Sequence, residues 1–353
     1  DTDTTWTRLQ ADLRLASGDY AQALEAYGDL LATDPPRPER AGILLGMAEA
    51  LCRLDRGHEA IRPASEALAL YEQLGAASER LHARYWLGYG HHAADNPDEA
   101  RAHHRAVLDE LRTSSNAAPD FYVRVLIALA LVEINAGNNV VARGYLEDAD
   151  GRSRELDARR QASFLLALAM GYRRTGDHEA AIRAGTQSLA LFRAAEARNE
   201  SAWIANNLAL VYLDSGSTKR AREMAKVGRD EARRLGDERL LSHIADTEAQ
   251  IAFASGDVKA ADALCDEAID LADRTGNNKA LLDALTTKAR VAMASDRGDA
   301  ALALYERAGA TARSVGPASR RREVLGAWAD ALAKLGRHDQ AYELMREAMQ
   351  GGR

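Results

Sequence analysis

The chain repeats itself with a period of about 40 residues, and this internal repeat limits its fold more than any other feature. The segments 17–23, 175–181 and 255–261 each contain a Gly-Asp pair and an alanine four residues after the aspartate. Alignment on that alanine gives nine anchors, which are Ala23, Ala60, Ala100, Ala142, Ala181, Ala221, Ala261, Ala301 and Ala341. Self-similarity at a fixed period is typical of solenoids. The length of 353 residues therefore reflects the number of repeats rather than several separate domains.

Two further positions recur in every repeat. Twelve residues before each anchor lies a small residue, namely Ala11, Ala48, Gly88, Ala130, Ala169, Ala209, Ala249, Ala289 or Ala329. Five residues before each anchor lies a turn residue, namely Gly18, Asp55, Asp95, Gly137, Gly176, Gly216, Gly256, Asp296 or Gly336. Small residues let two helices approach closely, and Gly or Asp between them ends the first helix. Each repeat is therefore predicted to be a hairpin of two helices.

The expected fold is all-α, a superhelix of about nine hairpins and about 18 helices. We expect one solenoid domain over residues 1–353, with repeats at approximately 4–38, 41–76, 81–116, 121–158, 161–198, 201–238, 241–278, 281–318 and 321–351. Glycines that suit the left-handed end of a second helix follow four anchors by fifteen residues, at Gly75, Gly236, Gly276 and Gly316.

Composition excludes several classes of protein. Aromatic residues make up only 5% of the chain and helix formers dominate, which disfavours a sheet-based fold. No apolar run approaches the roughly 18 residues that span a bilayer, so no membrane segment is expected. The net charge of −7 disfavours direct nucleic-acid contact. Cys52 and Cys265 have no metal-ligand spacing and fit a reducing, cytoplasmic location.

With these positions the repeat resembles the tetratricopeptide repeat, which has small residues at positions 8, 20 and 27 and a turn between them. The third small position is occupied here by Ala67, Ala149, Ser188, Gly228, Ala268, Ala308 and Ala348, and Leu30 and Val107 depart from it. The period also exceeds the roughly 34 residues usual for the family. Longer repeats of this kind are similar to those of bacterial regulators, namely the peptide-sensing RRNPP proteins, MalT-like activators and antibiotic regulatory proteins. The resemblance implies a right-handed superhelix that binds a peptide or protein in its concave groove.

In such a superhelix the first helix of each repeat lines the groove, and one stripe of each first helix faces it. The candidate binding residues on that stripe, in repeats three to seven, are Tyr85, Tyr89, Leu131, Met170, Arg173, Arg174, Trp203, Asn206, Asn207, Leu210, Asp214, His243 and Asp246. Apolar side chains could bury a ligand, and Arg or Asn could hold its carboxylate or backbone groups. The resemblance implies that Asn207 grips the ligand backbone. The alternative is that these residues pack against neighbouring repeats, with the asparagines hydrogen-bonded to a neighbouring helix.

Other chemistries have no support in the sequence. No nucleophile elbow, phosphate loop or zinc-protease motif is present, so no enzyme activity and no cofactor are expected. His91, His92, His103 and His104 cluster in one repeat, and we expect His91 to pack on His104. Zinc requires about four ligands in tetrahedral geometry, so this cluster predicts no metal site.

The preferred interpretation is a non-catalytic binding scaffold, the sensing or docking module of a bacterial regulator. The first alternative is an adaptor that assembles larger proteins through its convex face or its ends. The second is an accessory domain of an enzyme whose catalytic part lies outside this chain. Leu344, Met345 and Met349 lack an expected cover, which predicts that more protein flanks the segment or that the ends form a homodimer.

Overall fold

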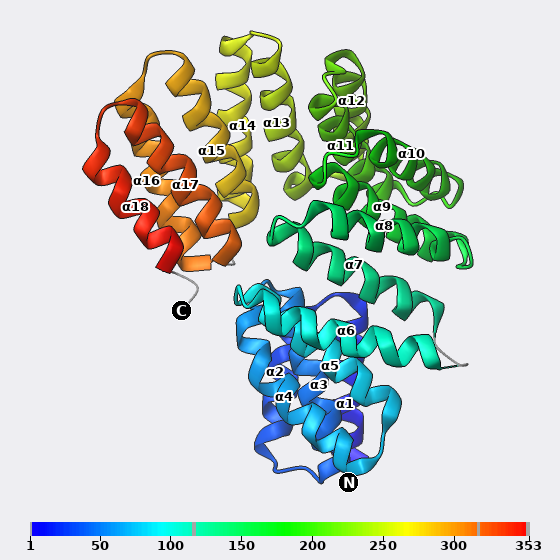
Figure 1. Cartoon of the computed structure of the whole chain (residues 1–353). Coiled ribbons are helices and arrows are strands. Elements are labelled where there is room, and N and C mark those ends of the chain that lie inside the picture. Colours follow the sequence, from blue (N-terminus) through cyan, green and yellow to red (C-terminus); the bar gives the residue numbers. More distant parts are fainter. Residues whose placement is uncertain (1, 115–117, 316–317, 351–353) are drawn as a thin grey trace. The chain divides into compact units, whose positions relative to one another are not determined.

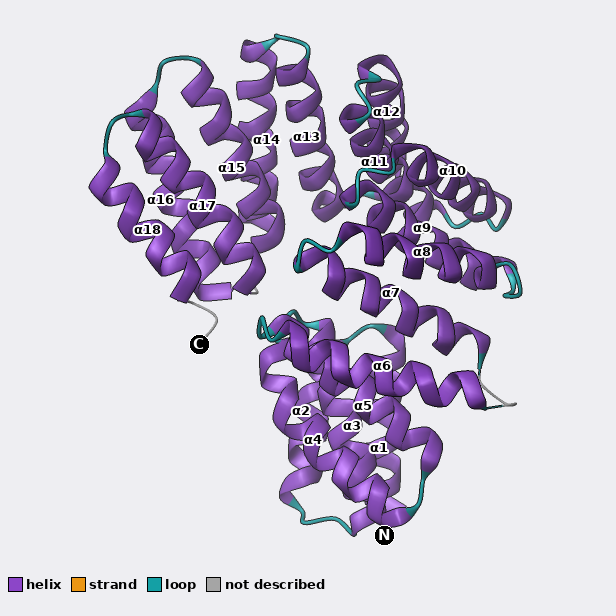
Figure 2. Cartoon of the chain, in the orientation of Figure 1, coloured by secondary structure: helices purple, strands orange, loops and turns teal. Residues whose placement is uncertain are grey.

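The computed structural model describes residues 2–114, 118–315 and 318–350 (Figure 1). Every regular element in these ranges is a helix, as the sequence predicted (Figure 2). The helices form two compact units that divide between Asn138 and Asn139. The expected fourth hairpin is shared between these units. One continuous solenoid domain over the whole chain stays a prediction.

Unit 1 contains the first seven helices: α1 (Thr2–Ser17), α2 (Tyr20–Ala32), α3 (Arg37–Arg53), α4 (Gly57–Leu74), α5 (Ala77–Ala93), α6 (Pro97–Thr113) and α7 (Pro119–Asn135). Unit 2 contains α8 (Asn139–Ser153), α9 (Ala158–Arg174), α10 (His178–Ala194), α11 (Arg198–Asp214), α12 (Thr218–Leu235), α13 (Glu238–Ala254), α14 (Val258–Thr275), α15 (Asn278–Ala294), α16 (Gly298–Val315), α17 (Ala318–Lys334) and α18 (His338–Gln350).

The turn residues inside the hairpins adopt the backbone conformation that their chemistry predicts. All nine predicted turn positions have positive φ, from 55° at Asp296 to 88° at Gly18. Gly, and less often Asp, tolerates this region because a larger side chain clashes with the backbone. Gly75, Gly236 and Gly276 end their helices in the left-handed conformation, whereas Gly316 lies outside the described residues.

Within each unit, the small residues lie on helices that pack against each other as hairpins. All nine anchor alanines and all nine upstream small residues are buried. At Gly88, an added Cβ would lie 2.8 Å from Cε1 of His104, which leaves no room for a side chain. The composition of the chain, rich in alanine and poor in aromatics, therefore follows from close helix packing.

The odd-numbered helices form the inner layer of each unit. In unit 2, α9 packs against α11, α11 against α13, α13 against α15, and α15 against α17. No even-numbered helix of the described chain packs comparably against the next even-numbered one. The first helices of successive repeats are therefore packed more closely than the second helices. That they line a concave groove stays a prediction.

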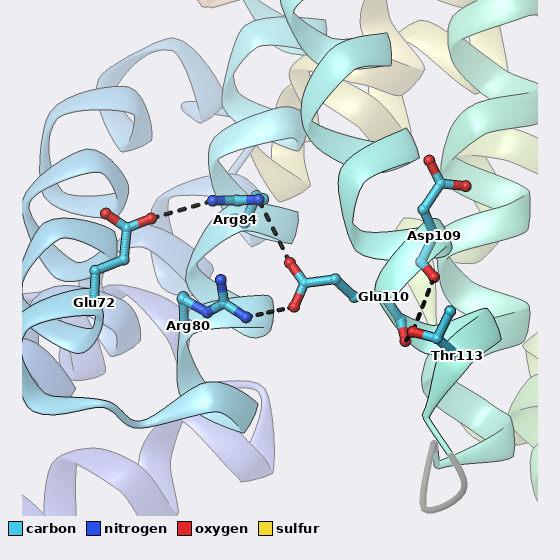
Figure 3. Close-up of polar contacts among 6 residues, drawn as sticks. All are labelled: Glu72, Arg80, Arg84, Asp109, Glu110 and Thr113. Atoms are coloured by element: carbon cyan, nitrogen blue, oxygen red, sulfur yellow. Dashed lines mark hydrogen bonds and ion pairs between the residues drawn. The ribbon is translucent and has the colours of Figure 1, made fainter.

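Ion pairs join successive hairpins at the surface. Arg84 of α5 contacts Glu72 of α4 at 3.1 Å and Glu110 of α6 at 3.6 Å, and Arg80 also pairs with Glu110 (Figure 3). Figure 3 shows Glu110 reaching from α6 toward both arginines, beside the end of that helix where Thr113 bonds back to the Asp109 carbonyl. These side chains are partly exposed, so each pair adds at most about 1 kcal/mol.

Candidate binding surface on the inner helices

The thirteen predicted site residues belong to two separate units. Tyr85, Tyr89 and Leu131 lie on α5 and α7 of unit 1. The other ten lie on α9, α11 and α13, three successive inner helices of unit 2. The structure therefore brings ten of the thirteen residues to one unit, and we describe the units individually.

On α11, the predicted residues occupy one face along the whole helix. Trp203, Asn207, Leu210 and Asp214 follow one another at steps of four, three and four residues, which places them on a single stripe. At about 1.5 Å per residue, the stripe is about 16 Å long from Trp203 to Asp214. An extended peptide of about five residues covers that length.

Asn206 and Asn207 differ sharply in their surroundings. Asn207 is only partly buried, and its amide has no hydrogen bond to the described residues. Asn206 is 4% exposed, and its Oδ1 has no hydrogen-bond partner. A buried amide cannot reach a ligand in the groove without movement of the helix, so only Asn207 is presented for binding.

The C-terminal ends of α9 and α11 are joined by an ion pair. Nε of Arg173 donates to Oδ2 of Asp214 at 2.6 Å. The two side chains remain 22% and 37% exposed, so solvent reaches both of them.

Arg174, the last residue of α9, follows Arg173 of that ion pair. Its side chain is exposed, yet surrounding protein lowers its pKa by desolvation. Glu323, on α17, opposes that decrease through its charge, and Arg173 adds to it.

At the other end of the α11 stripe, Trp203 and His243 form an aromatic pair. Their ring centroids lie 5.1 Å apart and the rings are inclined by 54°. Nε2 of His243 lies 3.1 Å from Nδ2 of Asn277, and Oδ1 of Asn277 accepts the Ala280 N–H at 3.2 Å as the cap of α15. The amide of Asn277 therefore donates to the ring, which fixes His243 as the tautomer that carries its proton on Nδ1.

The electrostatics of this end keep His243 neutral. Burial lowers its pKa to about 4, and the positive charges of Lys279 and Arg239 act in the same direction. Sequence reasoning missed Asn277, Arg239 and Lys279, because they precede or begin their helices rather than lie on the groove stripe. The asparagine just before the helix start was a usable signal for a cap.

Packing between the helices buries Asp246 and partly buries the apolar candidate residues. Asp246 is 5% exposed; burial raises its pKa, while hydrogen bonds from Thr287 and Gln250 oppose the increase. Trp203 packs partly against the buried core residues Ala202, Ala232, Leu240 and Ile244. Met170 and Leu210 are partly buried and keep some of their surface exposed.

In unit 1, the predicted residues contribute mainly to the core. Tyr85 is 5% exposed, with its ring 5.0 Å from Trp86 and 5.6 Å from Phe121, and burial raises its pKa. Tyr89 and Leu131 are partly buried. A tyrosine enclosed by aromatic rings has no free surface for a ligand.

The histidine cluster of α5 and α6 differs from the expected pairing. His91 stacks on His103, with centroids 5.4 Å apart, rather than on His104. His104 instead lies under Gly88 and beside Tyr85, 1% exposed, and burial lowers its pKa to about 3. Residue spacing alone did not distinguish adjacent positions of one helix. Among the described residues, no group of three or more His, Cys, Asp or Glu side chains could hold a metal ion.

Comparison with known proteins supports the repeat type and the fold. Residues 160–230 match the family model of the tetratricopeptide repeat, so this part of the chain consists of tetratricopeptide repeats. A search of curated protein sequences gives no significant match. None of the described helices is both long and apolar enough to cross a membrane.

Solved structures share the fold over nearly the whole chain. A Rap protein in complex with the competence and sporulation factor has a TM-score of 0.61 and 15% identity, covering 99% of this chain and 98% of that one. The apo form of RapI has a TM-score of 0.59 and 12% identity, covering 99% and 97%. Aspartyl phosphate phosphatase F from Bacillus subtilis has a TM-score of 0.57 and 10% identity, covering 99% and 94%. At these identities the similarity establishes a tetratricopeptide-type helical solenoid.

Proposed function

We propose that this chain is a non-catalytic binding module whose concave surface on α9, α11 and α13 holds a peptide or a segment of another protein. The observation that carries the proposal is the free amide of Asn207 on the inner layer, midway along the stripe that runs from Trp203 to Asp214. An amide that both donates and accepts can pair with one peptide unit. Partly exposed apolar side chains beside it, Met170 and Leu210, can bury ligand side chains.

The fold comparison supports this proposal. The Rap structure of the same fold was determined as a complex with the competence and sporulation factor, so such a solenoid accommodates a partner. We propose a similar role here, as the sensing or docking module of a bacterial regulatory protein in the cytoplasm. Small movements at successive helix interfaces add along a solenoid, so a bound segment would change the superhelical pitch.

A library of random heptapeptides, displayed on phage and selected against the full chain, tests the proposal. We expect selected peptides to lose at least about tenfold in affinity for a chain that carries Asn207→Ala and Arg173→Ala, since each loses a hydrogen-bonding or charged contact. Gln187→Ala is the matched control, because Gln187 is an exposed amide on α10, in the outer layer. Equal affinities for all three proteins would assign binding to the outer helices or the ends, as in the adaptor alternative.

Association of two chains through their ends stays a prediction. Trp6, Leu9 and Leu13 are exposed on α1, and Tyr342, Met345 and Met349 are exposed on α18. Exposed apolar stripes of this kind are typical of surfaces that bind another protein.

A further inference from the structure

One end of the α11–α13–α15 layer combines an aromatic surface with positive charges that lack partners. The rings of Trp203 and His243 are partly exposed, and His243 is held in place by Asn277. Arg239 and Lys279 are exposed and form no ion pair with the described residues. Arg239 precedes His243 by one turn of α13, and Lys279 follows Asn277, which bonds the His243 ring, by two residues. Both cations therefore lie near the aromatic pair.

The carboxylates at this end are already engaged. Asp237 accepts the Leu240 N–H at 2.9 Å as the cap of α13, and its second oxygen accepts from Asn199 at 3.4 Å. Glu238 pairs with Arg274 at 3.0 Å. The cations Arg239, Lys279 and Arg274 outnumber the carboxylates Asp237 and Glu238, so the local excess charge is positive, and Arg239 and Lys279 are exposed to solvent.

We propose that Trp203, His243, Arg239 and Lys279 form a subsite, called here the aromatic–cation subsite, that binds an aromatic side chain flanked by carboxylates. The aromatic ring of the ligand packs on the two rings of the protein, and its carboxylates face Arg239 and Lys279. The subsite rests on the proposed function, since it assigns a residue class to the segment that the groove holds.

The position of the subsite relative to Asn207 fixes the register of the ligand. Trp203 lies one helical turn, about 6 Å, from Asn207 along α11. Two residues of an extended chain span about 6.6 Å. A peptide unit held by Asn207 therefore places the side chain two residues further on at Trp203.

His243 contributes a flat, uncharged ring, because burial first and then the charges of Lys279 and Arg239 lower its pKa to about 4, against the smaller opposing effect of Asp237. A protonated imidazole there would add a third positive charge and lose its bond from Asn277, whose amide nitrogen can only donate. The neutral ring is what allows this face to pack against an apolar aromatic group.

Fluorescence anisotropy with the full chain tests the subsite. The probe is the labelled peptide Gly-Gly-Glu-Phe-Glu-Gly-Gly, compared with versions in which Phe is replaced by Ala or both Glu by Gln. We expect each replacement to weaken binding about tenfold, and higher salt to weaken the binding of the two peptides that keep Glu but not of the Gln version. Arg239→Gln with Lys279→Gln should reproduce the loss that the Glu-to-Gln peptide shows.

Matched variants separate the subsite from general effects. Lys219→Gln with Lys226→Gln removes the same charge from exposed positions on α12, and should leave the affinity unchanged. Trp203→Leu keeps an apolar side chain in the core contact and should still lose the preference for Phe over Ala. Circular dichroism confirms that each variant is folded.

Two outcomes would overturn the subsite. The first is equal affinity for the Phe and Ala peptides. The second is displacement of the probe by adenosine monophosphate at the same concentration as the unlabelled peptide needs. In either case, the proposed function would still hold if the affinity of the selected heptapeptides still depended on Asn207. Loss of that dependence for every peptide would instead overturn the proposed function itself.

Discussion

The contact between Gly88 and His104 gives a quantitative test of the close packing that defines each hairpin. In the Gly88→Ala variant, the new Cβ would lie 2.8 Å from Cε1 and 2.9 Å from Nδ1 of the His104 ring. The ring must therefore move by roughly half an ångström or more to reach ordinary contact. His104 is 1% exposed and has no free space to enter. Overpacking of this kind costs about 1–3 kcal/mol.

The helix gains about 0.5–1 kcal/mol when alanine replaces glycine, which offsets part of that cost. We therefore expect Gly88→Ala to lower the free energy of unfolding of unit 1 by about 1–2 kcal/mol, measured by urea denaturation and by hydrogen exchange of α5 and α6. Gly28→Ala is the control, because a Cβ there meets no atom within 4 Å. It should stabilise the chain by about 0.5–1 kcal/mol.

A double-mutant cycle decides whether the clash is the cause. In a His104→Ala background the ring is absent, so Gly88→Ala should become neutral or stabilising. If Gly88→Ala destabilises the chain equally with and without the His104 ring, the packing argument is refuted.

Three further predictions follow from buried groups and exposed ends. Burial lowers the pKa of His104 to about 3 in the folded chain, whereas an unfolded histidine takes up a proton near pH 6.5. The stability of unit 1 should therefore fall as the pH decreases from about 6.5 to about 3. In acid denaturation, His104→Leu should reduce that fall. Arg229 is nearly buried between Glu248 and Glu267, and burial raises the pKa of Glu248, so Arg229→Ala should lower the free energy of unfolding by about 2–3 kcal/mol in urea. Light scattering should show dimers that Met345→Asp weakens; a monodisperse monomer would contradict association through the ends.

The fold could be predicted from sequence because it depends on turn positions and helix-contact positions, each of which admits only a few residue types. The nine turn positions inside the hairpins have positive φ and are all Gly or Asp, and the close helix contacts are made at Ala or Gly. Both requirements appear in the sequence with a fixed period. They are therefore visible without any tertiary contact.

The binding residues were harder to predict, because a stripe on a helix does not fix how deeply each member is buried. Asn206 and Asn207 are adjacent, and only the packing of the neighbouring helices places one inside and the other at the surface. The pairing of His91 with His103 likewise depends on rotation between α5 and α6. Arg239 and Lys279 were missed because their role depends on His243, which is distant from Lys279 in sequence.

A crystal structure of the full chain with one selected heptapeptide tests the central claim most directly. The account predicts electron density for the peptide along α11, with its backbone on the Asn207 amide and its ends near the Trp203–His243 pair and the Arg173–Asp214 pair. Peptide density on the even-numbered helices or at the ends of the chain would contradict it.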